Sequence, residues 1–162
     1  TLGFSSAASD VYKRQVRGAY RLTENVDDDA PMIRLLGSGP IMKNVISASE
    51  DLNGRGITTE IWSVTSYGEL RREGLEFERI KRFDPKHEGV PYVEACFGDG
   101  IPTVAASDYI AAVPEMIQRW TKGGFLPLGT DGFGRSDTRE ELRRFFEVDS
   151  DSIVLALSLI HI

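Results

Sequence analysis

The chain has 162 residues, of which 41 % are hydrophobic and 27 % charged, and its formal net charge is −6 at pH 7. This length and composition are typical of one soluble domain with a sizeable core, and no apolar run approaches the roughly 20 residues that a membrane helix needs. The acidic balance would repel phosphate backbones, so we expect neither nucleic acid nor a membrane as a partner.

The two ends of the chain differ from its middle. A DNA string that encodes DVYKRQ, residues 10–15, has a reverse complement that encodes LSLIHI, residues 157–162. Folding supplies no reason for this complementarity, and the string resembles the transposase recognition end used in sequencing-library preparation. We therefore expect residues 1–15 and 157–162 to be translated adaptor that packs poorly, except where the apolar LSLIHI extends the last structural element. Residues 16–156 are then the natural domain.

Between these ends, short apolar or β-branched runs alternate with runs of helical period. The expected strands are residues 16–22, 32–36, 57–66, 101–107 and 125–130. The expected helices are residues 41–54 and 69–83, one that starts at residue 107 or 108 and one that follows residue 138, while residues 91–100 fit either a helix or a strand. This alternation predicts an α/β fold, a three-layer domain with a mostly parallel sheet.

Two of the expected helices have an apolar side that should face the core. In residues 69–83 this side consists of Leu70, Phe77 and Ile80. In the helix after residue 107, Pro114 should bend the helix or mark where its regular part begins. The apolar side of that helix consists of Ile110, Val113, Met116, Ile117 and Trp120.

A Gly37-Ser38-Gly39 turn joins the second strand to a helix, which is a place where open α/β sheets often bind ligands. This position suggests a phosphate site. However, the dinucleotide fingerprint G-x-G-x-x-G is incomplete, because its last position is Met42, and no P-loop lysine follows. We expect a structural turn that contributes to domain contacts.

Residues 129–149, GTDGFGRSDTREELRRFFEVD, form a second glycine-rich turn that leads into a helix. Thr138 and Glu141 have the spacing of a capping box, in which each side chain accepts a hydrogen bond from the other residue's backbone amide. The charged residues before Thr138 can pair among themselves or across an interface. We expect a loop that contacts another domain. Its polar members are Asp131, Arg135, Ser136 and Asp137.

Three other features lack the pattern of a catalytic or metal site. The acidic residues 27–29 do not have the ligand spacing or the glycine of a calcium loop. His87 lies in a polar, proline-flanked loop and is expected at the surface. Cys96, the single cysteine, forms neither a disulfide nor a CxxC motif, which fits a reducing cytoplasm, and we expect it to pack as a small hydrophobic residue.

Residues 33–74, together with the later runs VPYV, VAASDYI and LGTDGFGRSDTREELRRFFEVD, resemble the C-terminal domain of homodimeric-type pyruvate dehydrogenase. The resemblance covers nearly all of residues 16–156, and its most specific parts are WSVTS and GTDGFGRSD. The fold that it implies is that of the transketolase-like C-terminal domain.

The resemblance implies a cytoplasmic homodimer that uses thiamine diphosphate and magnesium. Such an enzyme decarboxylates pyruvate and reductively acetylates a lipoyl group on the dihydrolipoyl acetyltransferase component. Its cofactor lies between N-terminal and middle domains that are missing here, so we expect no catalytic, cofactor-binding or metal residue and no activity from this chain alone. What remains is a structural role in domain packing and in the dimer, with residues 37–39 and 129–137 as the contact loops.

Two other interpretations stay open. The chain is alternatively the C-terminal domain of a transketolase or of another 2-oxoacid dehydrogenase, although WSVTS and GFGRSD argue against this. The other alternative is a free-standing α/β module that binds an anion at the Gly-Ser-Gly turn.

Overall fold

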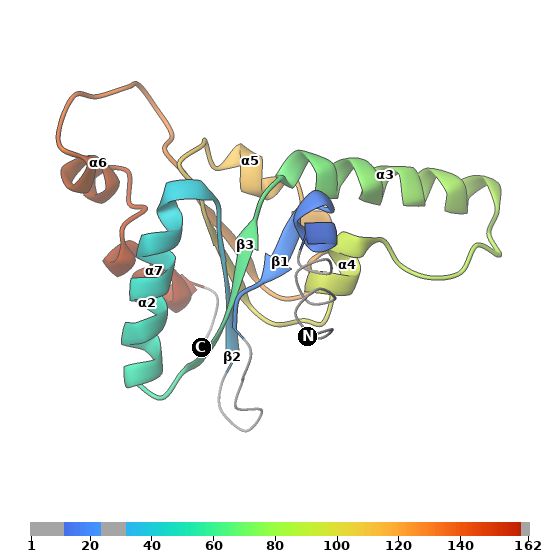
Figure 1. Ribbon diagram of the computed structural model, residues 1–162, viewed down its shortest axis with the longest axis horizontal. Coiled ribbons are helices and arrows are strands. Elements are labelled where there is room, and N and C mark those ends of the chain that lie inside the picture. The colour runs from blue at the N-terminus through green and yellow to red at the C-terminus, as the bar shows by residue number, and fades with distance from the viewer. Residues whose placement is uncertain (1–11, 24–31, 160–162) are drawn as a thin grey trace, which may run out of the picture.

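The computed structural model describes residues 12–23 and 32–159, and the strands within them form a five-stranded sheet (Figure 1). The strands are β1 Ala19–Arg21, β2 Met32–Gly37, β3 Thr58–Val64, β4 Thr103–Ala106 and β5 Phe125–Leu128. Their order is β1-β3-β2-β4-β5; only β1 is antiparallel, pairing with β3, while the other pairs are parallel. The prediction of a mostly parallel sheet is confirmed.

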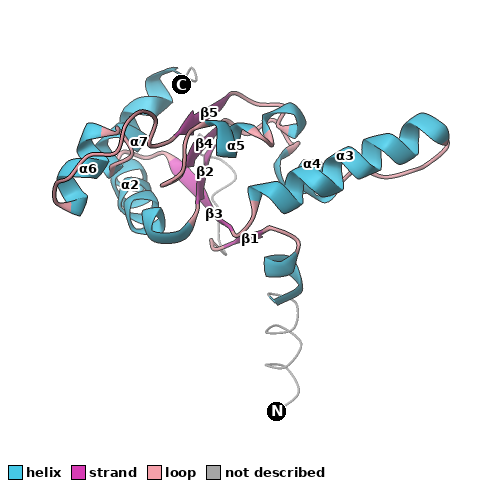
Figure 2. Ribbon diagram, turned by 90° about the horizontal axis from the view of Figure 1, so that it is seen from above, coloured by secondary structure: helices cyan, strands magenta, loops and turns pink. Residues whose placement is uncertain are grey.

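Helices cover both faces of the sheet, which gives the predicted three layers (Figure 2). One layer holds α2 Met42–Gly54, α6 Arg139–Phe145 and α7 Ser150–Ala156, and the other holds α3 Tyr67–Phe83, α4 Tyr92–Phe97 and α5 Ala112–Glu115. Short 3-10 helices are η1 Gly39–Ile41, η2 Gln118–Trp120 and η3 Leu157–Leu159. None of the described helices has both the length and the apolar character needed to cross a membrane.

The central strand β2 is buried on both faces. Ile33 and Leu35 belong to a core cluster with α2 and α7, whereas Leu36 belongs to a second cluster with α3 and α4. Because successive side chains of a strand point to opposite faces, Arg34 lies on the same side as Leu36. The near-continuous apolar run of this strand is thus explained by its position between two helical layers.

The edge strand β5 contains Pro127. The amides of Thr103 and Ser107 donate to the carbonyls of Gly124 and Leu128, over 2.8 and 3.0 Å. The even-numbered residues of this segment therefore face β4, and Pro127 faces outward. Its missing N–H group consequently removes no hydrogen bond from the sheet.

Helix α3 is confirmed, but only its first half is buried. It begins after Ser66, whose hydroxyl accepts from the amide of Glu69 over 3.1 Å. Leu70 is fully buried as expected, whereas Phe77 and Ile80 are only partly buried. The reason is visible in Figures 1 and 2, where the second half of α3 extends beyond the sheet.

The expected helix from residue 107 is wrong in its start and its length. Ser107 does not cap a helix; its hydroxyl accepts from the amide of Tyr109 over 3.1 Å in a tight turn. The segment forms only α5 and η2, and Pro114, which lacks an amide hydrogen, lies inside the four-residue α5. Ile117 and Trp120 are buried as expected, but Ile110 and Met116 are 52 % and 38 % exposed.

The two remaining helices, α4 and α7, lie where the sequence pattern did not clearly predict a helix. The ambiguous residues 91–100 contain α4. Helix α7 was not predicted; the Asp149 carboxylate caps it by accepting from the amide of Ser152 over 3.0 Å.

The expected adaptor segments are only partly described. Residues 1–11 and 160–162, and the acidic residues 27–29, lie outside the described part of the chain. Within it, Leu157 is 5 % exposed in the core cluster of α2 and α7, and η3 continues directly from α7. This is the extension of the last element that the apolar LSLIHI allows, and the adaptor origin of both ends stays a prediction.

Candidate functional site

The two loops expected to contact another domain lie at the same edge of the sheet. The Gly-Ser-Gly turn follows β2 and the second loop follows β5, so both lie at the carboxyl ends of parallel strands. An open pocket of about 430 Å³ is lined by Pro40 from the first connection and by Thr130 and Arg135 from the second. We call it the carboxyl-edge pocket. The structure thus brings residues of both connections to one site.

The turn after β2 has a structural explanation. A Cβ at Gly37 would collide with the Met42 side chain, so glycine lets this side chain pack directly on the strand. The Ser38 hydroxyl donates to the Ser107 hydroxyl over 3.1 Å, which links the ends of β2 and β4. Gly39 has a φ of +57°, a region that favours glycine. Gly37 and Ser38 therefore serve the packing of the domain, and Gly39 serves the backbone turn.

The loop after β5 is fixed to the segment after β4. A Cβ at Gly129 would lie 2.7 Å from the Cα of Ala111, so a larger residue would displace backbone. The Asp131 carboxylate accepts from the amide of Ala111 over 3.1 Å, and the Thr130 hydroxyl donates to the carbonyl of Asp108 over 2.8 Å. Backbone contacts, rather than ion pairs, set the position of the loop.

The charged residues of this loop form no ion pair with one another in the described structure. The Asp137 carboxylate accepts from the amide of Thr138 over 2.7 Å, and the Arg135 guanidinium lies 4.2 Å from the centroid of the Phe145 ring. Ser136 is exposed. Local partners thus occupy Asp131, Arg135 and Asp137, and pairing across an interface stays a prediction.

Helix α6 begins at the predicted cap, but only half of the capping box forms. The Thr138 hydroxyl accepts from the amide of Glu141 over 3.3 Å. In a full capping box the Thr138 amide would donate to the Glu141 carboxylate, but here it donates to the Asp137 carboxylate. The Glu141 carboxylate instead lies 3.7 Å from the Arg144 guanidinium. Asp137 and Thr138 together therefore fix the start of the helix.

Two arginines of α6, Arg139 and Arg143, also line the carboxyl-edge pocket. Arg143 donates to the side-chain oxygen of Asn44 over 2.9 Å and to the carbonyl of Pro40 over 3.1 Å. The sequence pattern did not single out these arginines as site residues. Their spacing of four places both on one side of the helix, but without the pocket this spacing is also that of an ordinary solvated helix face.

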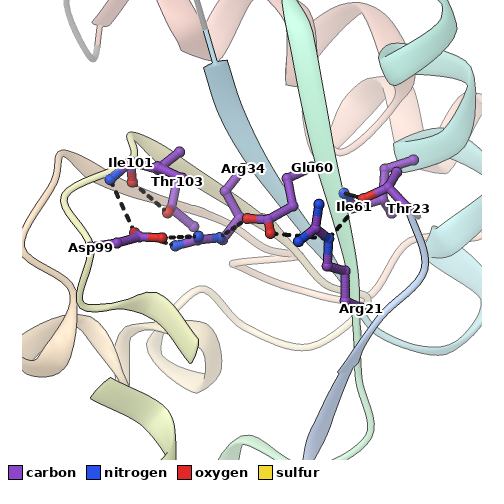
Figure 3. A network of polar contacts seen from close by, with 8 residues as sticks. All are labelled: Arg21, Thr23, Arg34, Glu60, Ile61, Asp99, Ile101 and Thr103. Atoms are coloured by element: carbon purple, nitrogen blue, oxygen red, sulfur yellow. Dashed lines mark hydrogen bonds and ion pairs between the residues drawn. The ribbon is translucent and has the colours of Figure 1, made fainter. Parts of the chain in front are cut away.

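A buried charge network lies nearer the amino ends of the strands, and it too was not predicted (Figure 3). The Arg34 side chain is 1 % exposed; it donates to Glu60 over 2.6 Å and to both carboxylate oxygens of Asp99 over 2.9 and 2.6 Å. Arg21 lies 3.2 Å from the other oxygen of Glu60. The network therefore joins β1, β3, β2 and the segment before β4.

The charge network explains why the pKa of Asp99 is lowered. Partial burial alone would raise the pKa of Asp99, but the hydrogen bonds and charge of Arg34 outweigh this effect and hold that pKa below its ordinary value. The one signal for the network is the parallel register, which places Arg34 directly beside Glu60. That signal becomes readable only when the register is known.

No group of three or more His, Cys, Asp or Glu side chains that could hold a metal ion occurs in residues 12–23 and 32–159. His87 is partly buried, with its ring 5.1 Å from that of Phe77. It therefore packs against α3 rather than standing free at the surface.

Comparison with protein families identifies the fold. Residues 18–149 match the family model described as the transketolase-like TK C-terminal domain. The chain belongs to this family. The family and the fold implied by the resemblance are confirmed.

Curated relatives of this transketolase-like domain are pyruvate dehydrogenase E1 components. That of Pseudomonas aeruginosa is 44 % identical over 145 residues, which are 87 % of this chain and 16 % of the relative. That of Mycobacterium tuberculosis is 40 % identical over 145 residues, 88 % of this chain and 16 % of the relative. That of Escherichia coli K12 is 39 % identical over 143 residues, which are 86 % of this chain and 16 % of the relative. The chain thus spans 16 % of the length of these relatives.

Solved structures similar to the transketolase-like domain include two transketolases. The enzyme from Leishmania mexicana has a TM-score of 0.60 and 19 % identity, with 89 % of this chain and 18 % of that chain covered. The enzyme from Campylobacter jejuni has a TM-score of 0.56 and 17 % identity, with 88 % and 18 % covered. At this identity the likeness establishes a shared fold.

In this transketolase-like domain, Cys96 should react slowly with alkylating agents. Burial raises the pKa of its thiol to about 11, although Tyr92 and Arg17 partly oppose the shift. At pH 8 the thiolate is then roughly 100-fold scarcer than for a thiol of pKa 9, and the higher nucleophilicity of a basic thiolate offsets only part of this loss. We expect iodoacetamide, followed by mass spectrometry, to label Cys96 at least about tenfold more slowly than the same chain unfolded in urea. Equal rates in the two states would contradict the burial argument.

Proposed function

We propose that the chain is the C-terminal part of a pyruvate dehydrogenase E1 component, the cytoplasmic enzyme that decarboxylates pyruvate and reductively acetylates lipoyl groups. The observation that carries the proposal is an identity of 38–44 % to pyruvate dehydrogenase E1 components. The transketolase structures are only 13–19 % identical. This difference favours pyruvate dehydrogenase over transketolase as the parent enzyme.

Thiamine diphosphate and magnesium belong, in this proposal, to other domains of the full enzyme. Magnesium bound with a diphosphate needs carboxylate or carbonyl ligands brought together at one place. Residues 12–23 and 32–159 contain no group of three or more His, Cys, Asp or Glu side chains that could hold a metal ion, and the proposal therefore assigns no magnesium ligand to them. We expect the chain alone to be inactive.

The role left to the domain is structural. Residues 37–39 and 129–137 would contact a neighbouring domain and the second copy of a homodimer, and the complete enzyme would deliver acetyl groups to the dihydrolipoyl acetyltransferase component. Phe133, in the second loop, is 97 % exposed. An exposed aromatic residue two positions from an arginine, here Arg135, has the composition of an interface hot spot.

The parent gene tests the proposed enzyme directly. Upstream of the codon for Val16, it should encode the thiamine-diphosphate-binding domains of a pyruvate dehydrogenase. A different upstream domain, or an unrelated reading frame, would refute the assignment to this enzyme.

The same upstream region tests the contact loop. When it is co-expressed with this chain as a separate polypeptide, the two should co-purify. Phe133→Asp should lower the co-purified amount at least about tenfold, because an interface hot-spot residue contributes about 2 kcal/mol or more. Phe83→Asp is the matched control, since Phe83 is also exposed, at 81 %, but lies at the end of α3. Equal effects of the two substitutions would count against the loop as an interface.

A further inference from the structure

The carboxyl-edge pocket lies at the topological switch point of the sheet, where the order in which strands are added reverses. From β2 the chain passes through α2 to β3 on one side, whereas β4 lies on the other side of β2. Open α/β sheets bind their ligands in the crevice at the carboxyl ends of two such strands. Pro40 follows β2 and Asp108 follows β4, and both line the pocket. Its location is therefore that of a ligand site, independent of the amides of the Gly-Ser-Gly turn.

The charge of the pocket is opposite to that of the whole chain. Arg135, Arg139 and Arg143 line it, against the single carboxylate of Asp108, although the chain carries a net charge of −6. Within the described residues none of these arginines forms an ion pair. Uncompensated positive charge on the wall of a concave site attracts anions.

Two of the arginines are already held in place. Arg143 is bound to neutral oxygens of Asn44 and Pro40, and its Nε atom is buried without a hydrogen-bond partner. Arg135 lies against the ring of Phe145. Guanidinium groups that are held before the ligand arrives lose less freedom on binding. The arginine side of the pocket is therefore largely pre-organised.

The rest of the lining limits the kind of anion. Leu142 and Phe146 supply apolar surface beside the arginines, and a volume of about 430 Å³ is that of a site for a small organic molecule. Three guanidinium groups match a phosphate better than a single carboxylate, because a phosphate group carries up to two negative charges and presents three terminal oxygens to their planar forks of donors. We propose that the carboxyl-edge pocket binds a small organic phosphate, with the phosphate on the arginines and the remainder over Leu142 and Phe146.

Titration calorimetry of the full 162-residue chain with ADP and with pyrophosphate tests this site. We expect saturable binding of both probes with a Kd below about 1 mM at low salt, weaker as salt rises. Arg139→Gln should weaken it at least tenfold and, because Arg139 is exposed, should leave the fold intact by circular dichroism. Arg79→Gln is the matched control, an exposed arginine on α3 that should leave the Kd unchanged.

Three results would overturn the proposal. Absence of saturable binding would show that the pocket is not a phosphate site. Equal Kd values for the Arg139→Gln chain and the unsubstituted chain would show that the bound anion does not lie on these arginines. Binding of citrate as tightly as pyrophosphate would show a general carboxylate site, such as one for acidic side chains of a neighbouring domain, and not a phosphate site. None of these results bears on the identity of the parent enzyme, which the upstream gene decides separately.

Discussion

Replacing Arg34 with methionine should lower the free energy of unfolding by about 3–5 kcal/mol, measured by urea denaturation at pH 7. The guanidinium is 1 % exposed and makes three hydrogen bonds to Glu60 and Asp99. Its removal leaves the Glu60 carboxylate buried, and among the described residues Arg21 is then the one cation paired with it. A buried charge without its partner is among the most destabilising changes that one substitution can make.

Two further variants separate the charge effect from lost packing. In Arg34→Met combined with Glu60→Leu, both buried charges are gone and most of the stability should return, since apolar side chains of similar size replace buried ion pairs well. Arg79→Met removes an exposed pair with Glu76 and should change stability by no more than about 0.5 kcal/mol. An Arg34→Met loss as small as that of Arg79→Met would show that the network contributes little.

Phe97→Ala should also destabilise the domain by about 3–5 kcal/mol in the same assay. Phe97, the last residue of α4, is fully buried in the second core cluster. Its ring lies edge-on to Trp62, with 5.0 Å between the ring centroids, and its centroid is 5.5 Å from the Arg34 guanidinium. Truncation leaves a cavity that these neighbours can fill only in part. Because Phe97 contacts Arg34, the two losses should not be additive in the double variant.

The control for this substitution is Phe83→Ala. Phe83 is 81 % exposed at the end of α3, so its truncation should change the free energy of unfolding by no more than about 0.5 kcal/mol. If the two alanine variants were equally stable, the second core cluster would not be packed as the structure has it.

The sequence predicted what depends on local pattern. The strands around Ile33, Ile61 and Val104 were recognisable because central parallel strands are rich in apolar and β-branched residues, and alternation with helices then implied the layers. The segment after Ser107 was mispredicted because its helical period was real but tertiary contacts overrode it: Gly129 packs against the backbone at Ala111.

The candidate site was only partly predictable, for a related reason. The two glycine-rich connections could be named from their composition, and their meeting at one edge follows from parallel strands. The roles of Arg34 and Arg139 could not be read in advance, because each depends on residues distant in sequence: Asp99 lies 65 positions from Arg34. A charged residue in a strand or on a short helix normally indicates contact with water.

The two margins of the sheet restrict how copies of this domain can associate. At one margin, the edge strand β1 has only three residues. At the other margin, Pro127 of β5 faces outward and offers no N–H group to an added strand. Neither margin can easily accept a further strand, so the sheet is protected against growth into continuous cross-molecule sheets or fibrils. A second copy must therefore be recognised through side chains and loops, which can be altered by single substitutions without changing the hydrogen bonding of the sheet.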